Sequence, residues 1–124
     1  MNIKENFYSL FKTGFLIFIT LFIAIIGLPC LFLPRKYTAM LIHNWSKIML
    51  ILFRKLDNLD WEVTGEENIP SGPFIIASKH QSIWDTVFFT AFFNDAAMVL
   101  KKIIIFIPFY GWHAIKAKMI WLDR

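Results

Sequence analysis

The sequence has little cysteine and few acidic residues. Its one cysteine, Cys30, lies in an apolar segment, which excludes zinc sites built from paired cysteines and argues against a thiol nucleophile. Nine acidic residues stand against 13 Lys and Arg, giving a net charge of +4. The basic residues are spread out and no nucleic-acid-binding motif accompanies them, so the excess favours a membrane surface over nucleic acid. Internal repeats and low-complexity tracts are also absent from the sequence.

Charge is missing from a long apolar run at positions 14–33, which is rich in Phe, Ile and Leu. About 20 apolar residues suffice to cross a bilayer as a helix. Lys12 precedes the run, Arg35 and Lys36 follow it, and no cleavage site of small residues comes after it. We therefore expect an uncleaved membrane anchor rather than a signal peptide, with its orientation left open because both flanks are basic.

The segment 37–53 has the pattern of an amphipathic helix. His43, Lys47 and Arg54 project to one side, within about 40° of one another on a helix of about 3.6 residues per turn. Apolar side chains lie opposite, at Leu41, Trp45, Ile48 and Leu52. Such a helix is suited to lying among anionic headgroups. Alternatively, it packs on the protein core with its basic side in water.

The polar stretch 57–60 breaks this helical pattern and marks a boundary. We expect a membrane anchor and amphipathic helix over residues 1–56 and a second unit over residues 57–124. The second unit opens with a strand-like segment at 61–65.

A second apolar run, at 73–77, leads into a polar turn that contains His80. Turn residues at 70–72 bracket the run on its other side, so it has the pattern of a buried strand. The four residues from Ser82 to Asp85 follow the Ser-x-x-acid pattern of a helix N-terminus, and residues 87–93 supply an apolar helix body. A strand, a turn and a helix in this order are where α/β proteins place ligands.

His80 and Asp85 can act together only if His80 precedes the helix. On one continuous helix of about 3.6 residues per turn, their side chains would point about 140° apart. With His80 in the turn, the Asp85 carboxylate can accept the proton of one imidazole nitrogen and leave the other nitrogen as a general base for a substrate hydroxyl. The alternative is that Asp85 only completes a capping box with Ser82 and that His80 is an ordinary turn residue.

Further blocks follow this motif in order. Residues 96–100 form a strand-like segment, and after them come Lys101-Lys102, the stretch Ile107-Pro108-Phe109-Tyr110-Gly111-Trp112, and an apolar strand that ends in Asp123-Arg124. Together with His-x-x-x-x-Asp, these blocks resemble the glycerolipid acyltransferases, specifically the bacterial 1-acylglycerol-3-phosphate acyltransferases. The resemblance covers residues 61–124.

The resemblance implies an α/β fold in which an N-terminal membrane-associated helical pair precedes the first part of a mixed αβ acyltransferase domain with an incomplete sheet. It implies transfer of a fatty acyl group from an acyl thioester to lysophosphatidate, giving phosphatidate. His80 would be the base and Asp85 would orient it. Arg124, and Lys101 in preference to Lys102, would bind the phosphate of the acceptor. Lysines at strand ends can equally be solvated.

The implied partners are the lipid acceptor and an acyl donor, either acyl-CoA or acyl carrier protein, with no cofactor, no metal and no nucleic acid. The implied location is the bacterial inner membrane, with the catalytic part on the cytoplasmic side. A thioester is already activated, so a hydroxyl oxygen can attack it once a base removes its proton, and no enzyme nucleophile is needed.

The family's pattern continues with a Glu-Gly-Thr-Arg block and a later strand block containing Pro, and neither occurs in this sequence. We therefore expect the N-terminal half of such an enzyme, either a fragment or a chain whose site another chain completes. Two other functions stay open. One is a catalytically silent remnant that binds membrane or lipid. The other is a hydrolase that uses His80 and Asp85 with a metal, although further ligands at metal-site spacing are lacking.

Overall fold

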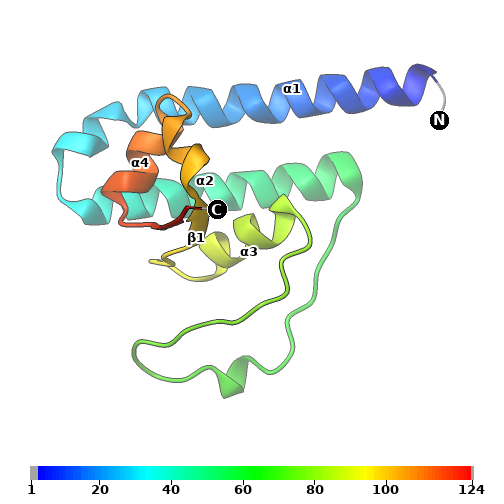
Figure 1. Ribbon diagram of the computed structural model, residues 1–124. Coiled ribbons are helices and arrows are strands. Elements are labelled where there is room, and N and C mark those ends of the chain that lie inside the picture. Colours follow the sequence, from blue (N-terminus) through cyan, green and yellow to red (C-terminus); the bar gives the residue numbers. More distant parts are fainter. Residues whose placement is uncertain (1–2, 124) are drawn as a thin grey trace.

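The computed structural model describes residues 3–123 and is mostly helical, with one small sheet (Figure 1). The helices are α1 (Ile3–Ile26), α2 (Arg35–Asp57), α3 (Ile83–Phe92) and α4 (Tyr110–Lys116). Three short 3₁₀ helices accompany them, η1 (Leu28–Phe32), η2 (Glu66–Asn68) and η3 (Lys102–Phe106), and the two strands are β1 (Val99–Lys101) and β2 (Ile120–Leu122).

Helices α1 and α2 form an antiparallel pair joined by η1 (Figure 1). Near one end of the pair, Lys12 forms an ion pair with Asp57. Further along, the indole nitrogen of Trp45 donates a hydrogen bond to Thr20 Oγ1 at 3.2 Å. Helix α1 is long and apolar enough to cross a bilayer, by its length and composition. The expected apolar helix therefore forms, but it starts at Ile3 and ends at Ile26 instead of running over 14–33.

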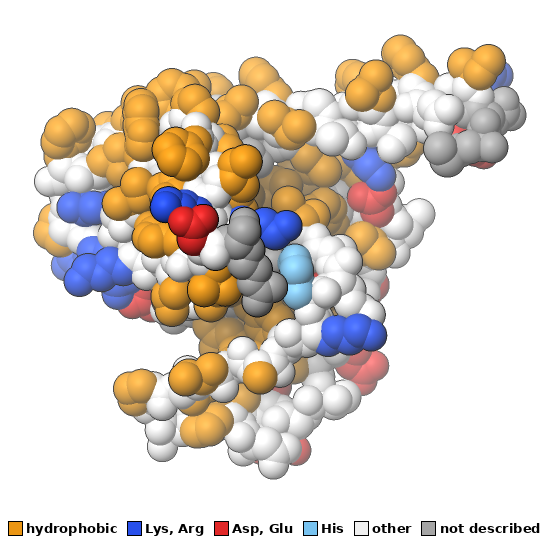
Figure 2. Space-filling view, viewed as in Figure 1, with side chains coloured by type: hydrophobic (Ala, Val, Ile, Leu, Met, Phe, Trp, Pro, Cys, Tyr) orange, Lys and Arg blue, Asp and Glu red, His pale blue; other side chains and the backbone are white. Residues whose placement is uncertain are grey.

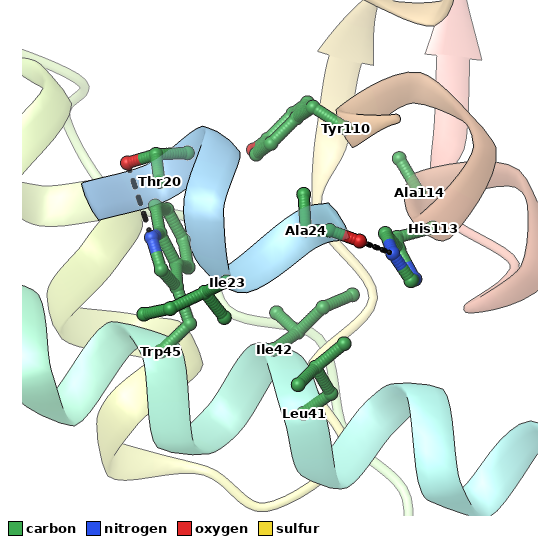
Figure 3. Close-up of a pocket in the computed structure, with 9 residues that line it drawn as sticks. All are labelled: Thr20, Ile23, Ala24, Leu41, Ile42, Trp45, Tyr110, His113 and Ala114. Atoms are coloured by element: carbon green, nitrogen blue, oxygen red, sulfur yellow. Dashed lines mark hydrogen bonds between the residues drawn. The ribbon is translucent and has the colours of Figure 1, made fainter. Parts of the chain in front are cut away.

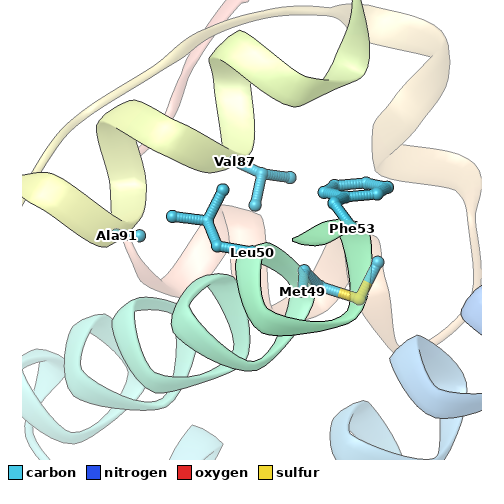
Figure 4. Packing of buried hydrophobic residues seen from close by; sticks show 5 residues of the cluster. All are labelled: Met49, Leu50, Phe53, Val87 and Ala91. Atoms are coloured by element: carbon cyan, nitrogen blue, oxygen red, sulfur yellow. The ribbon is translucent and has the colours of Figure 1, made fainter. Parts of the chain in front are cut away.

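The main hydrophobic core lies between α2 and α3. Its buried members are Met49, Leu50, Phe53, Val87 and Ala91 (Figure 4). On α2, Phe53 lies three and four residues from the other two members, and the two members on α3 are four residues apart, because one stripe of each helix faces the other. Burial of a side chain such as Val87, which is 1% exposed, stabilises a fold by about 1.5–3 kcal/mol.

This packing corrects part of the predicted amphipathic pattern of α2. His43 does not belong to a free basic stripe, because its Nδ1 lies 3.0 Å from the carbonyl oxygen of Thr90 on α3. Ile48, placed on the apolar side, is 43% exposed. A helical projection shows which residues share a face, but α2 contacts both α1 and α3, and the projection cannot say which face each neighbour covers.

The sheet consists of β1 and β2, which pair in parallel with Val99 opposite Ile120 and Lys101 opposite Leu122. Parallel strands need a crossover connection, and here η3 and α4 supply it. The strand expected at 96–100 is thus present, shifted toward the C-terminus. Among the described residues, the predicted α/β character is limited to these two strands and the helices that connect them.

Two predicted strands, at 61–65 and 73–77, do not form. Residues 58–82 are a long loop whose one regular element is η2 (Figure 1). Ile75, predicted to be buried in a strand, is 96% exposed. An apolar pattern of this kind favours a strand only where a neighbouring strand forms a sheet with it. No strand of the described chain lies beside either segment. The predicted division at residues 56 and 57 stays a prediction, although α2 does end at Asp57.

Candidate active site

The turn before α3 has the local structure that the sequence predicts. Helix α3 begins at Ile83, so His80 lies outside the helix. Ser82 is the N-cap residue, with an extended backbone (φ −159°), and its Oγ accepts a hydrogen bond from Trp84 N at 3.2 Å. The amide of Ser82 donates to Asp85 Oδ2 at 3.3 Å, which completes the capping box. This box satisfies backbone N–H groups that have no partner within the helix.

Asp85 also holds His80. Its Oδ1 accepts a hydrogen bond from His80 Nδ1 at 2.9 Å, while its Oδ2 accepts from the backbone N–H of Gln81 at 2.7 Å. The sequence left open whether Asp85 caps the helix or contacts His80, and in the structure it does both. Partial burial would raise the pKa of Asp85, but hydrogen bonds from Gln81, Ser82 and His80 outweigh it and lower that pKa below its usual value.

The contact favours one tautomer of the imidazole ring. An ionised carboxylate can only accept hydrogen bonds, so Nδ1 of His80 must carry the proton that it donates to Asp85. In the neutral ring the other nitrogen, Nε2, is then an acceptor. The His80 side chain is 72% exposed and the Asp85 side chain is 17% exposed, so the imidazole is open to solvent while the carboxylate that holds it is shielded. This geometry is suited to a general base.

Aromatic side chains pack behind this turn. Trp84 stacks on Phe88 with ring centroids 5.1 Å apart, and Trp61 from the long loop lies against both rings. The indole nitrogen of Trp84 is buried and has no hydrogen-bond partner within residues 3–123. Figure 2 shows that the surface is hollowed between the loop and the helices, with hydrophobic side chains at the back of the hollow. Trp84 is part of the packing that supports the turn.

The predicted phosphate-binding residues are distributed differently. Lys102 forms an ion pair with Asp123 at 2.9 Å, which joins the end of β1 to the end of β2. Lys101 is exposed, and no ion pair or hydrogen bond links it to His80 or Asp85 within the described residues. Because its side chain is exposed and has no ion pair within residues 3–123, its ammonium is available to an anion. Arg124 lies outside the described residues, so its predicted role stays a prediction.

Sequence reasoning missed a second set of polar contacts, on α4. His113 is 3% exposed, and its Nε2 donates to the carbonyl oxygen of Ala24 on α1 at 2.8 Å (Figure 3). The two residues border a small apolar pocket of about 30 Å³, together with Thr20 and Tyr110. Burial raises the pKa of the Tyr110 hydroxyl. Ala24 and His113 are 89 positions apart, so no local spacing could have signalled the pair.

A third contact ties the start of α2 to the rest of the chain. The guanidinium of Arg35 pairs with Asp95 and also donates to the carbonyl oxygen of Ala117 at 3.2 Å. The hydrogen bonds that Arg35 donates to the Asp95 carboxylate raise the pKa of Arg35 further. This contact positions α4 against α2, but it lies on a different part of the chain from the turn that holds His80.

The geometry, an imidazole held by a carboxylate at the N-terminus of a helix, is thus compatible with general-base chemistry. The family model described as Acyltransferase matches residues 60–124. A 1-acyl-sn-glycerol-3-phosphate acyltransferase of Pseudomonas aeruginosa is 41% identical over 83 residues, which are 67% of this chain and 32% of that protein. A protein of the same name from Saccharomyces cerevisiae is 33% identical over 93 residues, which are 74% of this chain and 28% of that protein.

These matches place the chain in the glycerolipid acyltransferase family, as the sequence blocks indicated. The chain spans about a third of the length of these two curated relatives. No solved structure matches it.

Proposed function

We propose that this chain carries the base of an enzyme that transfers a fatty acyl group from an acyl thioester to the free hydroxyl of lysophosphatidate, forming phosphatidate. The observation that carries the proposal is the 2.9 Å contact between His80 Nδ1 and Asp85 Oδ1, which leaves Nε2 of an exposed imidazole as a proton acceptor. The names of the two curated relatives support the choice of acceptor.

The reaction needs one proton removed and one returned. Nε2 of His80 takes the proton of the acceptor hydroxyl as the oxygen attacks the thioester carbonyl. The new C–O ester bond forms, the C–S bond breaks, and the thiolate leaves and is protonated by the imidazolium. Asp85, ionised because its pKa is lowered, stabilises the imidazolium between these steps. A positioned base of this kind contributes about 10²- to 10⁴-fold in rate.

The substrates follow from the same proposal. Lys101 and Arg124 are the residues that we assign to the acceptor's phosphate, because a charge-assisted hydrogen bond to phosphate is strong and arginine can bind it through two N–H groups. The donor is acyl-CoA or acyl carrier protein, and no further cofactor takes part. Helix α1 keeps the chain at a membrane, which we assign to the bacterial inner membrane with the site on its cytoplasmic side.

The test is phosphatidate formation from lysophosphatidate and acyl-CoA by membranes that contain the chain. We expect His80→Ala to lower the rate by about 10²- to 10⁴-fold. The exposed neighbour Lys79 provides the matched control, and Lys79→Ala should retain the rate of the unmodified chain. Equal rates for the unmodified chain and His80→Ala would overturn the proposal.

A second candidate is a role in membrane or lipid binding without turnover. The exposure of the site favours this candidate. The His80 side chain is 72% exposed, and water weakens the electrostatic interactions that a catalytic site needs. This candidate predicts vesicle binding that His80→Ala leaves unchanged and no phosphatidate formation. Acyl transfer by the purified chain would exclude it.

A further inference from the structure

Four large apolar side chains are exposed on the adjacent elements η3 and α4. They are Ile103, Phe106, Trp112 and Ile115, which are 72%, 75%, 47% and 52% exposed. A 3₁₀ helix has about 3.0 residues per turn, so Ile103 and Phe106 lie on one side of η3. Residues three apart on an α-helix are also neighbours, which places Trp112 beside Ile115 on α4. We call these four residues the η3–α4 apolar face.

This face belongs to a tightly packed unit. A Cβ atom on Gly111 would lie 2.0 Å from the carbonyl oxygen of Ile105, so only glycine lets α4 approach η3 this closely. The backbone N–H of Gly111 donates to Ile107 at 2.8 Å, and the rings of Phe109 and Trp112 meet edge to face at 5.2 Å. The apolar side chains are therefore presented by a fixed backbone.

Positive charge accompanies the face. The segment 99–122 contains four lysines, Lys101, Lys102, Lys116 and Lys118, and no Asp or Glu. Lys102 is paired with Asp123, which leaves the segment strongly basic. Figure 2 shows Lys and Arg side chains bordering the region where hydrophobic side chains gather over η3 and α4. Apolar side chains flanked by lysines match the chemistry of an anionic membrane surface.

The face also lies close to the apolar helix α1. His113 joins α4 to α1 through Ala24, so the two helices are fixed to each other (Figure 3). On α1 itself the side chains of Phe18, Phe22 and Ile26 are 61%, 51% and 62% exposed. Figure 2 shows further hydrophobic side chains along α1, on the same side of this view as η3 and α4. A bilayer that contains α1 would therefore lie close to η3 and α4.

We propose that the η3–α4 apolar face is a second membrane contact, which inserts into the headgroup region of an anionic bilayer while α1 anchors the chain. Trp112 suits this depth, because indole rings favour the boundary between apolar and polar layers. The contact fixes the orientation of the sheet end, where Lys101 lies, relative to the lipid surface. It goes beyond acyl transfer and holds whether or not the chain turns over substrate.

Spin labels measure the contact directly. The starting chain is Cys30→Ala with α1 intact, and a nitroxide is attached to Phe106→Cys in one sample and to Ile75→Cys in another. Ile75 is the matched control because it is 96% exposed and lies in the long loop. The chains are bound to vesicles of phosphatidylcholine with phosphatidylglycerol, and relaxation by oxygen is compared with relaxation by a water-soluble nickel complex.

We expect the ratio of oxygen to nickel relaxation to be severalfold higher at position 106 than at position 75. The double change Lys116→Gln and Lys118→Gln should lower that ratio, and vesicles of phosphatidylcholine alone should do the same. Equal ratios at the two positions would overturn the proposal. Dipolar broadening between labels at position 106 that grows with protein density would also overturn it, because a second copy of the chain would then cover the face.

Discussion

His80 and His113 each place one ring nitrogen within 3 Å of an oxygen, at 2.9 and 2.8 Å, but the two regions differ in what surrounds the other nitrogen. The His80 side chain is 72% exposed, so its Nε2 can meet a substrate. His113 is 3% exposed, and its Nδ1 has no hydrogen-bond partner within the described residues. The same kind of side chain is therefore a candidate base in one region and a link between helices in the other.

The hydrogen-bond partners of the two histidines also differ, in charge and in distance along the sequence. Asp85 is five residues from His80 and carries a charge that can stabilise an imidazolium. Ala24 offers His113 a neutral backbone carbonyl from a helix far away in the sequence. Access and partner charge, not the presence of a hydrogen bond, separate the candidate catalytic histidine from the structural one.

The largest effect should come from Asp85→Asn. An amide can turn its NH₂ group toward Nδ1 of His80, which makes Nδ1 the acceptor and moves the proton to Nε2, where the base is needed. We expect the rate of acyl transfer to fall by about 10²- to 10⁴-fold, measured in the same phosphatidate assay. Ser82→Ala is the control, because it weakens the cap by about 1 kcal/mol and leaves the pair of His80 and Asp85 in place. Equal losses in both variants would mean that Asp85 matters only as a cap.

The second-largest effect should be a loss of stability when His113 is replaced. His113→Leu removes the donor to Ala24 and leaves a buried carbonyl unpaired, so the free energy of unfolding should fall by about 1–3 kcal/mol. Urea unfolding in detergent micelles measures it. In His113→Gln the side-chain amide can reach the position of Nε2, and we expect part of the loss to be recovered. If His113→Gln is as unstable as His113→Leu, the hydrogen bond is not what joins α4 to α1.

A smaller effect is the acid dependence of stability. The pKa of Asp85 is lowered in the folded chain, so its carboxylate stabilises the fold above the usual unfolded value of about 3.9. That contribution is lost as the pH falls through the lowered folded value. The urea midpoint should therefore decline less on acidification in Asp85→Asn than in the unmodified chain. Parallel declines in the two chains would show that this carboxylate is not linked to folding.

The local parts of the candidate site were predictable from the sequence. The cap at Ser82, the start of α3 and the meeting of His80 with Asp85 depend on contacts within six residues, for which turn and capping preferences are strong. The apolar helix α1 was predictable because an uncharged run of this length has few alternatives. Its exact ends were not, because the helix also includes residues 3–13.

The parts that depend on distant contacts were not predictable. The strand expected at 73–77 needs a neighbouring strand, and a sequence pattern cannot say whether one is present. The face of α2 that holds His43 is set by α3, which packs against it. His113 offers no signal in its own neighbourhood, because its partner lies on another helix.

Asp85 accepts hydrogen bonds from the imidazole of His80 and from the amides of Gln81 and Ser82, so the first turn of α3 and the candidate base are coupled. When this turn frays, the imidazole loses its orienting carboxylate in the same event. Hydrogen exchange at those two amides therefore reports the fraction of time for which the base is assembled, without any substrate present. A ligand that prefers the assembled turn will slow that exchange, which offers a way to rank candidate acceptors by their effect on a single helix end.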